Sequence, residues 1–462
     1  MKLEGRKTLV LGAGKSGVTS AAFLASKGAI VALNDRKPLY EWSDEAIALK
    51  ESLGVGLIDG DLPSWLLDQI DLVVISPGIP TSVIPAKYVE RKDGEVIGEV
   101  ELAYRFLSNR FVGITGSNGK TTTTTLIGEL LRDAGVASAV GGNIGYPLVS
   151  MIGNVADDAW IVAELSSFQL ETIKDFRANI GVCMNVTPNH MDRYDLFTDY
   201  AAAKRRLFLN QTSEDLAILN ADDEVTAAWA KELGARVVLF STKRELDEGL
   251  FLRGMDLVSR GGDSERVLLR RDEMRLRGLH NVENVLAAFA VGLACGADPE
   301  SMRETAKSFN AVEHRLEYCG EKDGVSFYND SKATSVDAAK KALEALSEEP
   351  GEIIAIMGGL GKNAPYEPLA ELVDRKVRHI VLIGEDAPKI EAELGAFAEM
   401  SHAKDMEEAV ALAYGAAKPK DTVLLAPACA SFDMFRTYEH RGEVFKKAVE
   451  ELIRKEGTGA GA

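Results

Sequence analysis

The chain has 462 residues, of which 46% are hydrophobic and 27% are charged, a composition typical of a globular protein with two to four domains. The net charge of −18 argues against a nucleic-acid surface but leaves room for a local pocket that binds one anionic metabolite. There is no signal-peptide pattern, no apolar run long enough to span a membrane, and no C-x-x-C among the four cysteines. We therefore expect a cytoplasmic protein with reduced thiols.

The first motif is a glycine turn. A strand-like run over residues 7–11 leads into Gly12-Ala13-Gly14-Lys15-Ser16-Gly17, and a helical stretch is followed by a second apolar run over residues 29–33 that ends at Asp35. This order is the dinucleotide-fold fingerprint, although the same turn suits any phosphate or nucleotide sugar. Another strand, over residues 71–76, runs into Pro77-Gly78, and we expect this unit to end near Gly98.

The most informative motif reads as a triphosphate cradle: Gly113-Ile114-Thr115-Gly116-Ser117-Asn118-Gly119-Lys120-Thr121-Thr122. An apolar run precedes it and a helical pattern follows it, which is the context that a phosphate loop requires. Lys120 would reach the outer phosphates and the Thr121 hydroxyl would bind magnesium. The general pattern G-x-x-x-x-G-K-[ST] is not met, because Ile114 stands at its first glycine. A glycine-rich turn with a chance lysine is the weaker alternative.

Further strands and helices extend this α/β pattern to the end of the chain. Apolar strands over residues 160–163 and 181–185 lead to Glu164 and His190, and a helix is predicted over residues 280–293. A third α/β unit has predicted strands over residues 326–328, 353–357, 379–383 and 422–425. We predict three Rossmann-like domains in series, over residues 1–98, 99–311 and 312–462, with a disordered tail over residues 457–462.

Two polar residues at strand ends leave alternatives open. Glu164 would bind magnesium at a triphosphate site, or would equally well cap the helix that follows. His190 is a metal or phosphate contact, or a turn residue. His314-Arg315 lies at the second domain junction, where the arginine would bridge two domains through a phosphate or form an ordinary surface pair.

Lys204 occupies an unusual position. If residues 199–210 are helical, Lys204 shares an apolar face with Tyr200, Leu207 and Phe208. A snorkelling lysine is the usual explanation of such a position. A buried lysine has a lowered pKa and can become nucleophilic, even toward carbon dioxide.

Two polar loops follow strands of the third unit, Tyr328-Asn329-Asp330-Ser331-Lys332-Ala333-Thr334-Ser335 and Pro427-Ala428-Cys429-Ala430-Ser431-Phe432-Asp433. Ligands bind at the strand ends of an α/β sheet. Lys332 and Ser431 therefore suit an anionic substrate.

Taken together, these motifs resemble the Mur ligases, ATP-dependent amide-forming enzymes of peptidoglycan synthesis. The matching segments, in the family's order, are 115–121, Glu164-Leu165-Ser166-Ser167-Phe168-Gln169, 185–194, His280-Asn281-Val282-Glu283-Asn284 and His314-Arg315. Residues 329–334 and 427–431 look like the D-glutamate-adding branch of the family. The D-N-P-R motif of the diaminopimelate- or lysine-adding branches is absent.

The resemblance implies a role for each matching residue. Those implied to bind ATP are Gly116, Ser117, Asn118, Gly119, Lys120, Thr121, Thr122, Asn281, Asn284, Arg315 and Asp330. Those implied to bind a UDP-linked substrate are Gly14, Ser16, Asp35, Gly78 and Asn143. Those implied to bind D-glutamate are Lys332, Thr334, Ser431, Phe432 and Tyr438. The implied metal ligands are Thr121, Glu164, His190 and Lys204 as a carbamate, and the implied catalytic residues are Lys120, Asn143, His190 and Lys204.

The resemblance also implies ATP, two magnesium ions and a carbamylated Lys204 as cofactors. The implied substrates are UDP-N-acetylmuramoyl-L-alanine, D-glutamate and ATP, acted on by a cytoplasmic monomer with no nucleic-acid or membrane partner. Because ATP and D-glutamate would lie on different domains, we expect closure of the third domain to assemble the site.

Three positions depart from the family pattern, and other functions stay open. Asn189 stands where an aspartate is common, Arg36-Lys37 where an arginine is expected at the second position, and Tyr438 where a phenylalanine is expected. The first two leave metal and UDP affinity open. The alternatives are a folylpolyglutamate synthase, a non-catalytic nucleotide-sugar-binding protein, and an NAD-dependent oxidoreductase.

Overall fold

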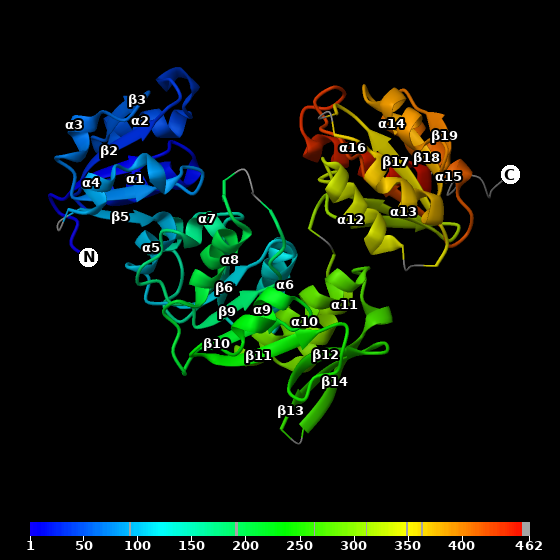
Figure 1. Ribbon diagram of the computed structural model, residues 1–462, viewed down its shortest axis with the longest axis horizontal. Helices are drawn as coiled ribbons and strands as arrows, with labels where there is room; N and C mark the ends of the chain where they lie inside the picture. The colour runs from blue at the N-terminus through cyan, green and yellow to red at the C-terminus, as the bar shows by residue number, and fades with distance from the viewer. Residues whose placement is uncertain are drawn as a thin grey trace. The chain divides into compact units, whose positions relative to one another are not determined.

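The computed structural model contains three α/β sheets (Figure 1). It describes residues 1–91, 94–189, 193–262, 264–310, 312–347, 350–361 and 364–454. One compact unit comprises Met1–Arg270 with Glu283–Thr305, and the other comprises Arg271–Val282 with Ala306–Ala462. The first unit holds two of the sheets and the second unit holds the third. The predicted α/β fold with three successive Rossmann-like sheets is confirmed, whereas the tail over residues 457–462 lies outside the described residues.

The first sheet is parallel, in the order β3-β2-β1-β4-β5. Its strands are β1 (Lys7–Leu11), β2 (Ile30–Asp35), β3 (Gly56–Asp59), β4 (Leu72–Ile75) and β5 (Glu95–Gly98). Its helices are α1 (Lys15–Ser26), α2 (Asp44–Leu53), α3 (Ser64–Leu67), α4 (Ala86–Val89) and α5 (Glu99–Tyr104), with 3₁₀ turns η1 (Leu39–Glu41) and η2 (Thr81–Val83). Val10 packs with α1 and α2, whereas Leu9 and Leu11 pack with α3 and α4. Both faces of the sheet are thus covered, as the continuous apolar run of β1 predicts.

The glycine turn of this sheet is fixed by close packing. Gly12 has a φ of +98°, and a Cβ there would lie 2.7 Å from Ser76 Oγ. A Cβ on Gly17 would lie 1.7 Å from the Gly12 carbonyl oxygen, so only glycine lets α1 approach β1 this closely.

The central sheet has the order β14-β13-β12-β11-β10-β9-β6-β8-β7. Its strands are β6 (Arg110–Thr115), β7 (Ser138–Gly142), β8 (Trp160–Glu164), β9 (Ile180–Cys183), β10 (Leu216–Asn220), β11 (Arg236–Ser241), β12 (Gly249–Arg253), β13 (Asp256–Gly261) and β14 (Ser264–Arg270). Its helices are α6 (Lys120–Asp133), α7 (Ser167–Leu170), α8 (Phe197–Arg205), α9 (Glu224–Trp229), α10 (Leu279–Ala294) and α11 (Pro299–Ser308), with η3 (Leu148–Met151), η4 (Arg206–Phe208) and η5 (Arg271–Glu273). Strands β6 to β12 run parallel, and β12–β14 form an antiparallel meander at the edge that the sequence analysis did not resolve.

The third sheet has the order β15-β16-β20-β17-β18-β19, parallel except for β15. Its strands are β15 (Glu317–Lys322), β16 (Val325–Asn329), β17 (Ile353–Gly358), β18 (Val377–Ile383), β19 (Glu399–His402) and β20 (Thr422–Leu425). Its helices are α12 (Val336–Leu346), α13 (Ala370–Lys376), α14 (Ala387–Leu394), α15 (Met406–Ala416) and α16 (Tyr438–Arg454), with η6 (Glu367–Leu369). Alternate residues of β17 enter two cores, one with α12 to α14 and the other with α15 and α16. Because β16, β20 and β17 are parallel neighbours, the loops that follow them leave the same carboxyl edge of the sheet.

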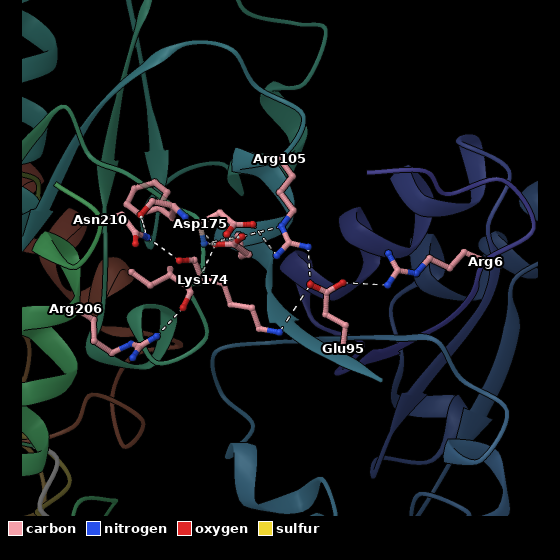
Figure 2. Close-up of polar contacts among 10 residues, drawn as sticks. Arg6, Glu95, Arg105, Lys174, Asp175, Arg206 and Asn210 are labelled. Carbon is pink, nitrogen blue, oxygen red and sulfur yellow. Dashed lines mark hydrogen bonds and ion pairs between the residues drawn. The ribbon is translucent and has the colours of Figure 1, made fainter. Parts of the chain in front are cut away.

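An ionic network joins the first sheet to the central one (Figure 2). Glu95, at the start of β5, accepts from Arg6 at 3.0 Å and from Arg105 at 2.7 Å, and Arg105 also pairs with Asp175 at 3.1 Å. The buried Glu101 carboxylate accepts from Arg105 Nε at 2.8 Å and from the backbone N–H groups of residues 174 to 176 at 2.8–3.1 Å. The segment from β5 to α5, which carries Glu95 and Glu101, is thereby tied to the loop at residues 174–176, before β9 of the central sheet.

The predictions about the cysteines and about membrane-spanning segments can also be compared with the structure. The four cysteines are free thiols, of which Cys183 and Cys429 are buried. Over the described residues, every helix is too short or too polar to cross a bilayer.

Candidate active site

The predicted phosphate loop joins β6, an inner strand between β9 and β8, to a helix. Strand β6 ends at Thr115 and α6 begins at Lys120, so residues 116–119 form the turn between them. A Cβ on Gly116 would lie 2.9 Å from Met184 Cβ, and one on Gly119 would lie 2.5 Å from Asn284 Oδ1. Ile114 is fully buried within β6, which explains why the first glycine of the general pattern is absent.

The segment after β9 braces this loop. The Ser117 N–H donates to the Asn185 carbonyl oxygen at 2.9 Å, and the Asn118 N–H donates to Asn185 Oδ1 at 2.9 Å. Ser117 Oγ lies 3.0 Å from the Tyr200 hydroxyl. Lys120 folds back over the loop, where its Nζ donates to the carbonyl oxygen of Gly116 at 2.9 Å. These contacts fix the conformation of the loop.

Glu164 lies at the end of β8, next to β6, with 1% of its surface exposed. Its Oε1 accepts from Asn143 Nδ2 at 2.8 Å, whereas Oε2 is buried with no hydrogen-bond partner among the described residues. The helix-capping alternative is wrong, because Ser166 and Gln169 form the capping box of α7. A buried carboxylate oxygen without a partner is costly, and a cation ligated there would satisfy it. The donor chemistry therefore fits magnesium.

Asn143 reaches Glu164 because two strand ends lie close together. Gly142 pairs with Glu164 across β7 and β8, and a Cβ on Gly142 would lie 2.4 Å from the Glu164 carbonyl oxygen. The backbone N–H of Asn143 donates to that same oxygen at 2.8 Å. The sequence analysis found Asn143 only through the family resemblance.

Lys204 is buried beside the phosphate loop. Only 2% of it is exposed, and its Nζ donates to the Gly116 carbonyl oxygen at 2.8 Å and lies 4.6 Å from the centre of the Tyr200 ring. Burial, and then the charge of Lys120, lowers the pKa of Lys204 to about 7. The snorkelling interpretation is therefore wrong.

The element that carries Lys204 is shorter than predicted. Helix α8 ends at Arg205, and residues 206–208 form the 3₁₀ turn η4 in place of a helix that continues to residue 210. The predicted face survives this change, because Tyr200, Leu207 and Phe208 are all buried. Helices often end in a 3₁₀ turn, and the hydrophobic periodicity alone does not predict where the α-helix stops.

The remaining predicted ATP residues divide between the two compact units. Asn284 is buried and accepts from Thr123 Oγ1 at 3.2 Å, beside the phosphate loop. Asn281, Arg315 and Asp330 belong to the other unit, so their role toward ATP stays a prediction. Burial raises the pKa of Asp330 to about 7, against the opposing charge of Arg315. His190 lies outside the described residues.

The predicted UDP-substrate residues stand at the carboxyl edge of the first sheet. Asp35 Oδ2 accepts from the Ala13 N–H at 2.8 Å, so this carboxylate shapes the glycine turn. Gly14 and Gly78 are exposed in the loops after β1 and β4, and Ser16 lies in the first turn of α1.

Two side chains not assigned from the sequence tie these loops to the central sheet. Lys15 Nζ donates to the Gly145 carbonyl oxygen at 2.6 Å, and Arg193 donates to the carbonyl oxygen of Pro77 at 3.3 Å. Arg193 also pairs with Glu171 at 3.2 Å. No sequence pattern identifies such contacts, because they join segments more than 100 residues apart.

The predicted D-glutamate residues gather on strand-end loops of the third sheet. Lys332 Nζ donates to the Tyr438 hydroxyl at 3.2 Å. The tyrosine, which stands where the family pattern has a phenylalanine, therefore adds a polar contact. Ser431 is buried, Thr334 is half-buried, and Phe432 is 70% exposed.

The sequence analysis missed a third loop, residues 358–361 after β17. Leu360 and Ala430 exchange two backbone hydrogen bonds at 2.9 and 3.0 Å, which join this loop to the one after β20. The sequence feature that could have identified this loop is the pair Gly358-Gly359 at the end of a buried strand. Both glycines have a positive φ, a backbone conformation that favours glycine.

A wide cleft of about 1010 Å³ lies elsewhere, at the amino ends of β5 and β6, where Arg6, Glu95 and Arg110 line it. It contains none of the predicted site residues. Parallel sheets bind their ligands at the opposite, carboxyl edge.

Comparison with known proteins covers nearly the whole chain. Residues 6–98 match the Mur ligase MurD-like N-terminal domain, residues 114–292 the Mur ligase middle domain, and residues 314–429 the Mur ligase glutamate ligase domain. A UDP-N-acetylmuramoylalanine–D-glutamate ligase from Solibacter usitatus is 48% identical, covering 99% of this chain and 100% of that protein. One from Koribacter versatilis is 45% identical over the same shares.

Solved structures support the fold. A pseudomurein peptide ligase type C from Methanothermus fervidus has a TM-score of 0.57 at 19% identity, covering 97% of this chain and 100% of that one. UDP-N-acetylmuramate-alanine ligase MurC from Thermotoga maritima has a TM-score of 0.56 at 19% identity, covering 96% and 99%.

Proposed function

Because the chain belongs to the Mur ligase family, we propose that it joins D-glutamate to UDP-N-acetylmuramoyl-L-alanine at the expense of ATP, in the cytoplasmic synthesis of peptidoglycan precursors. The full-length similarity to D-glutamate ligases supports this substrate choice over a folylpolyglutamate synthase. An ATP-consuming ligase also accounts for the triphosphate loop, which an NAD-dependent oxidoreductase would not need.

One observation carries the catalytic assignment. Two costly buried groups lie beside the Gly116–Gly119 loop: the Glu164 oxygen, which has no hydrogen-bond partner in the described part of the chain, and the Lys204 amine. These two groups argue against a non-catalytic nucleotide-sugar-binding protein. Such a protein would have no use for a triphosphate-binding loop flanked by two buried groups that destabilise the fold.

Magnesium fits this arrangement. Thr121, Glu164, His190 and a carbamylated Lys204 would hold two ions, which would neutralise charge on the transferring phosphoryl group. The carbamate forms when the neutral Lys204 amine attacks carbon dioxide and releases a proton. This turns a buried cation into an anionic oxygen ligand.

The chain's own residues position and stabilise the reacting groups. The backbone N–H groups in the first turn of α6 and Lys120 would offset the charge that develops as the alanyl carboxylate attacks the γ-phosphorus and ADP leaves. The amine of D-glutamate then attacks the acyl phosphate carbon, loses a proton, and expels phosphate. Asn143 would orient Glu164 and contact the UDP-linked substrate.

We assign the three ligands to three domains over residues 1–98, 99–311 and 312–462. The first would bind the UDP-linked substrate through Gly14, Ser16, Asp35 and Gly78. The second would bind ATP through the phosphate loop, Asn281 and Asn284, and Arg315 and Asp330 of the third would contribute to ATP binding. The third would bind D-glutamate through Lys332, Thr334, Ser431, Phe432 and Tyr438. The protein would act as a monomer with small-molecule substrates only.

Phosphate release tests the function directly. Purified protein with ATP, magnesium and UDP-N-acetylmuramoyl-L-alanine should release phosphate on addition of D-glutamate, and not on addition of L-glutamate, D-aspartate or a diamino acid. Equal turnover of D- and L-glutamate would contradict the substrate assignment, and absence of any phosphate release would contradict the ligase assignment.

A further inference from the structure

A fully buried arginine lies beneath the strand-end loops of the third sheet. Arg441, in the first turn of α16, has no exposed surface. Arginine is almost never buried this completely unless it is paired, so the position calls for an explanation.

The guanidinium group of Arg441 binds two loops at once. Its Nε donates to Ser331 Oγ at 3.0 Å, and one terminal nitrogen donates to the Ser331 carbonyl oxygen at 2.9 Å, both in the loop after β16. Its terminal nitrogens also donate to the Cys429 carbonyl oxygen at 3.1 Å and to that of Ala430 at 3.3 Å, both in the loop after β20. Ser331 Oγ donates onward to the Tyr438 carbonyl oxygen at 2.7 Å, which links the loop back to α16.

The third loop rests on the same group. A Cβ on Gly359 would lie 3.2 Å from a terminal nitrogen of Arg441 and 2.3 Å from the Ala430 carbonyl oxygen. Three of the loops that leave the carboxyl edge of this sheet, those after β16, β17 and β20, therefore meet at one planar side chain, whose rigid fork fixes their spacing.

No carboxylate in the described part of the chain forms an ion pair with Arg441. Over the described residues, all of its hydrogen-bond acceptors are uncharged oxygens, and the nearby Asp433 carboxylate acts on it only at longer range. Burial lowers the pKa of Arg441 to about 10, so the group remains a cation at neutral pH. A buried cation held only by carbonyl and hydroxyl oxygens is an expensive way to tie loops together.

We propose that Arg441 is a positioning residue for the amino-acid substrate, which sets the spacing of the loops that carry Lys332 and Ser431 and supplies a positive field to a dicarboxylate. This inference rests on the proposed function, because it requires D-glutamate to bind at these loops. The two substrate carboxylates would add negative charge near Arg441 to that of Asp433.

The test compares Arg441→Lys with Arg454→Lys, an exposed arginine near the end of the same helix. Lysine keeps the charge but loses the fork, so we expect the KM for D-glutamate to rise about tenfold or more in Arg441→Lys. The KM values for ATP and the UDP-linked substrate should change less than about twofold. Arg454→Lys should match the wild type.

Two further measurements separate this role from simple loss of folding. Ser331→Ala removes the Nε contact and the hydrogen bond to the Tyr438 carbonyl oxygen but keeps the other Arg441 contacts, and should raise the KM for D-glutamate in the same direction while the protein stays folded by circular dichroism. In Arg441→Ala, millimolar guanidinium should lower the KM for D-glutamate. Should that variant fail to fold, Arg441→Lys and Ser331→Ala decide the question.

An unchanged KM for D-glutamate in Arg441→Lys and Ser331→Ala would overturn the proposal, as would equal rises in the KM of all three substrates. Wild-type protein that releases no phosphate with D-glutamate would instead refute the proposed function. The two failures are therefore distinguishable.

Discussion

The pKa of Lys204 leads to a quantitative prediction about its carbamylation. Burial lowers this pKa from 10.5 to about 7, so about half of the amines are neutral at pH 7, against roughly one in three thousand for an ordinary lysine. Only the neutral amine reacts with carbon dioxide. The structure thus increases the reactive fraction by roughly a thousandfold.

Replacing Lys204 should remove most activity, and small acids should restore part of it. In Lys204→Ala we expect a loss of at least about 100-fold in phosphate release, because the proposed oxygen ligand is gone. Acetate or formate should fill the vacated space and bring back a measurable fraction. Lys204→Arg should show no rescue, because its guanidinium occupies the space with the wrong charge.

The carbamate can also be observed directly. Wild-type protein equilibrated with ¹³C-bicarbonate should give one carbamate NMR signal that Lys204→Ala lacks. The signal and the activity should both decline as the pH falls below about 7, because protonation of the amine then competes with carbamylation. Full activity of Lys204→Ala without added acid, or an unchanged NMR signal in that variant, would refute the reasoning.

Three other predictions concern separate parts of the chain. Lys120→Ala should abolish acyl-phosphate formation yet leave binding of the UDP-linked substrate nearly intact in isothermal titration; a collapse of that binding would contradict our assignment of the two ligands to separate domains. Lys332→Ala should raise the KM for D-glutamate far more than that for ATP in the phosphate assay, and an equal rise would contradict its assignment. Glu101→Ala leaves three backbone N–H groups and Arg105 without their acceptor, so it should cost about 3–5 kcal/mol and lower the calorimetric melting temperature by several degrees. The control Glu232→Ala, at an exposed ion pair, should cost less than about 1 kcal/mol, and similar losses in both variants would contradict the network's role.

The buried strands could be predicted from the sequence because they are continuous apolar runs. Strand β1 was predicted at its observed limits, and β17 extends its prediction by one residue. Apolar runs bounded by glycines give a strong local signal. The antiparallel edge strands β13 and β14 lack that signal, because β14 is mostly exposed.

The site could be predicted only where its residues lie in contiguous motifs. The phosphate loop and Glu164 follow strands, so their positions follow from the topology of a parallel sheet. The hydrogen bond from Lys204 to Gly116 joins residues 88 positions apart, and periodicity could place Lys204 on an apolar face but could not name its partner. Arg441 likewise stands among ordinary helix residues, and only the fold shows that its contacts lie up to 110 positions away.

The glycine turn of the first sheet has a consequence for inhibitor resistance. An alanine at position 17 would collide with a backbone oxygen at 1.7 Å, which no change at Ser76 could relieve. An alanine at position 12 would retain the strain of a φ of +98° even if Ser76 were made smaller. A compound that binds the backbone of this turn would therefore contact positions that cannot change singly without loss of the enzyme, and escape mutations would have to arise in the loops around it.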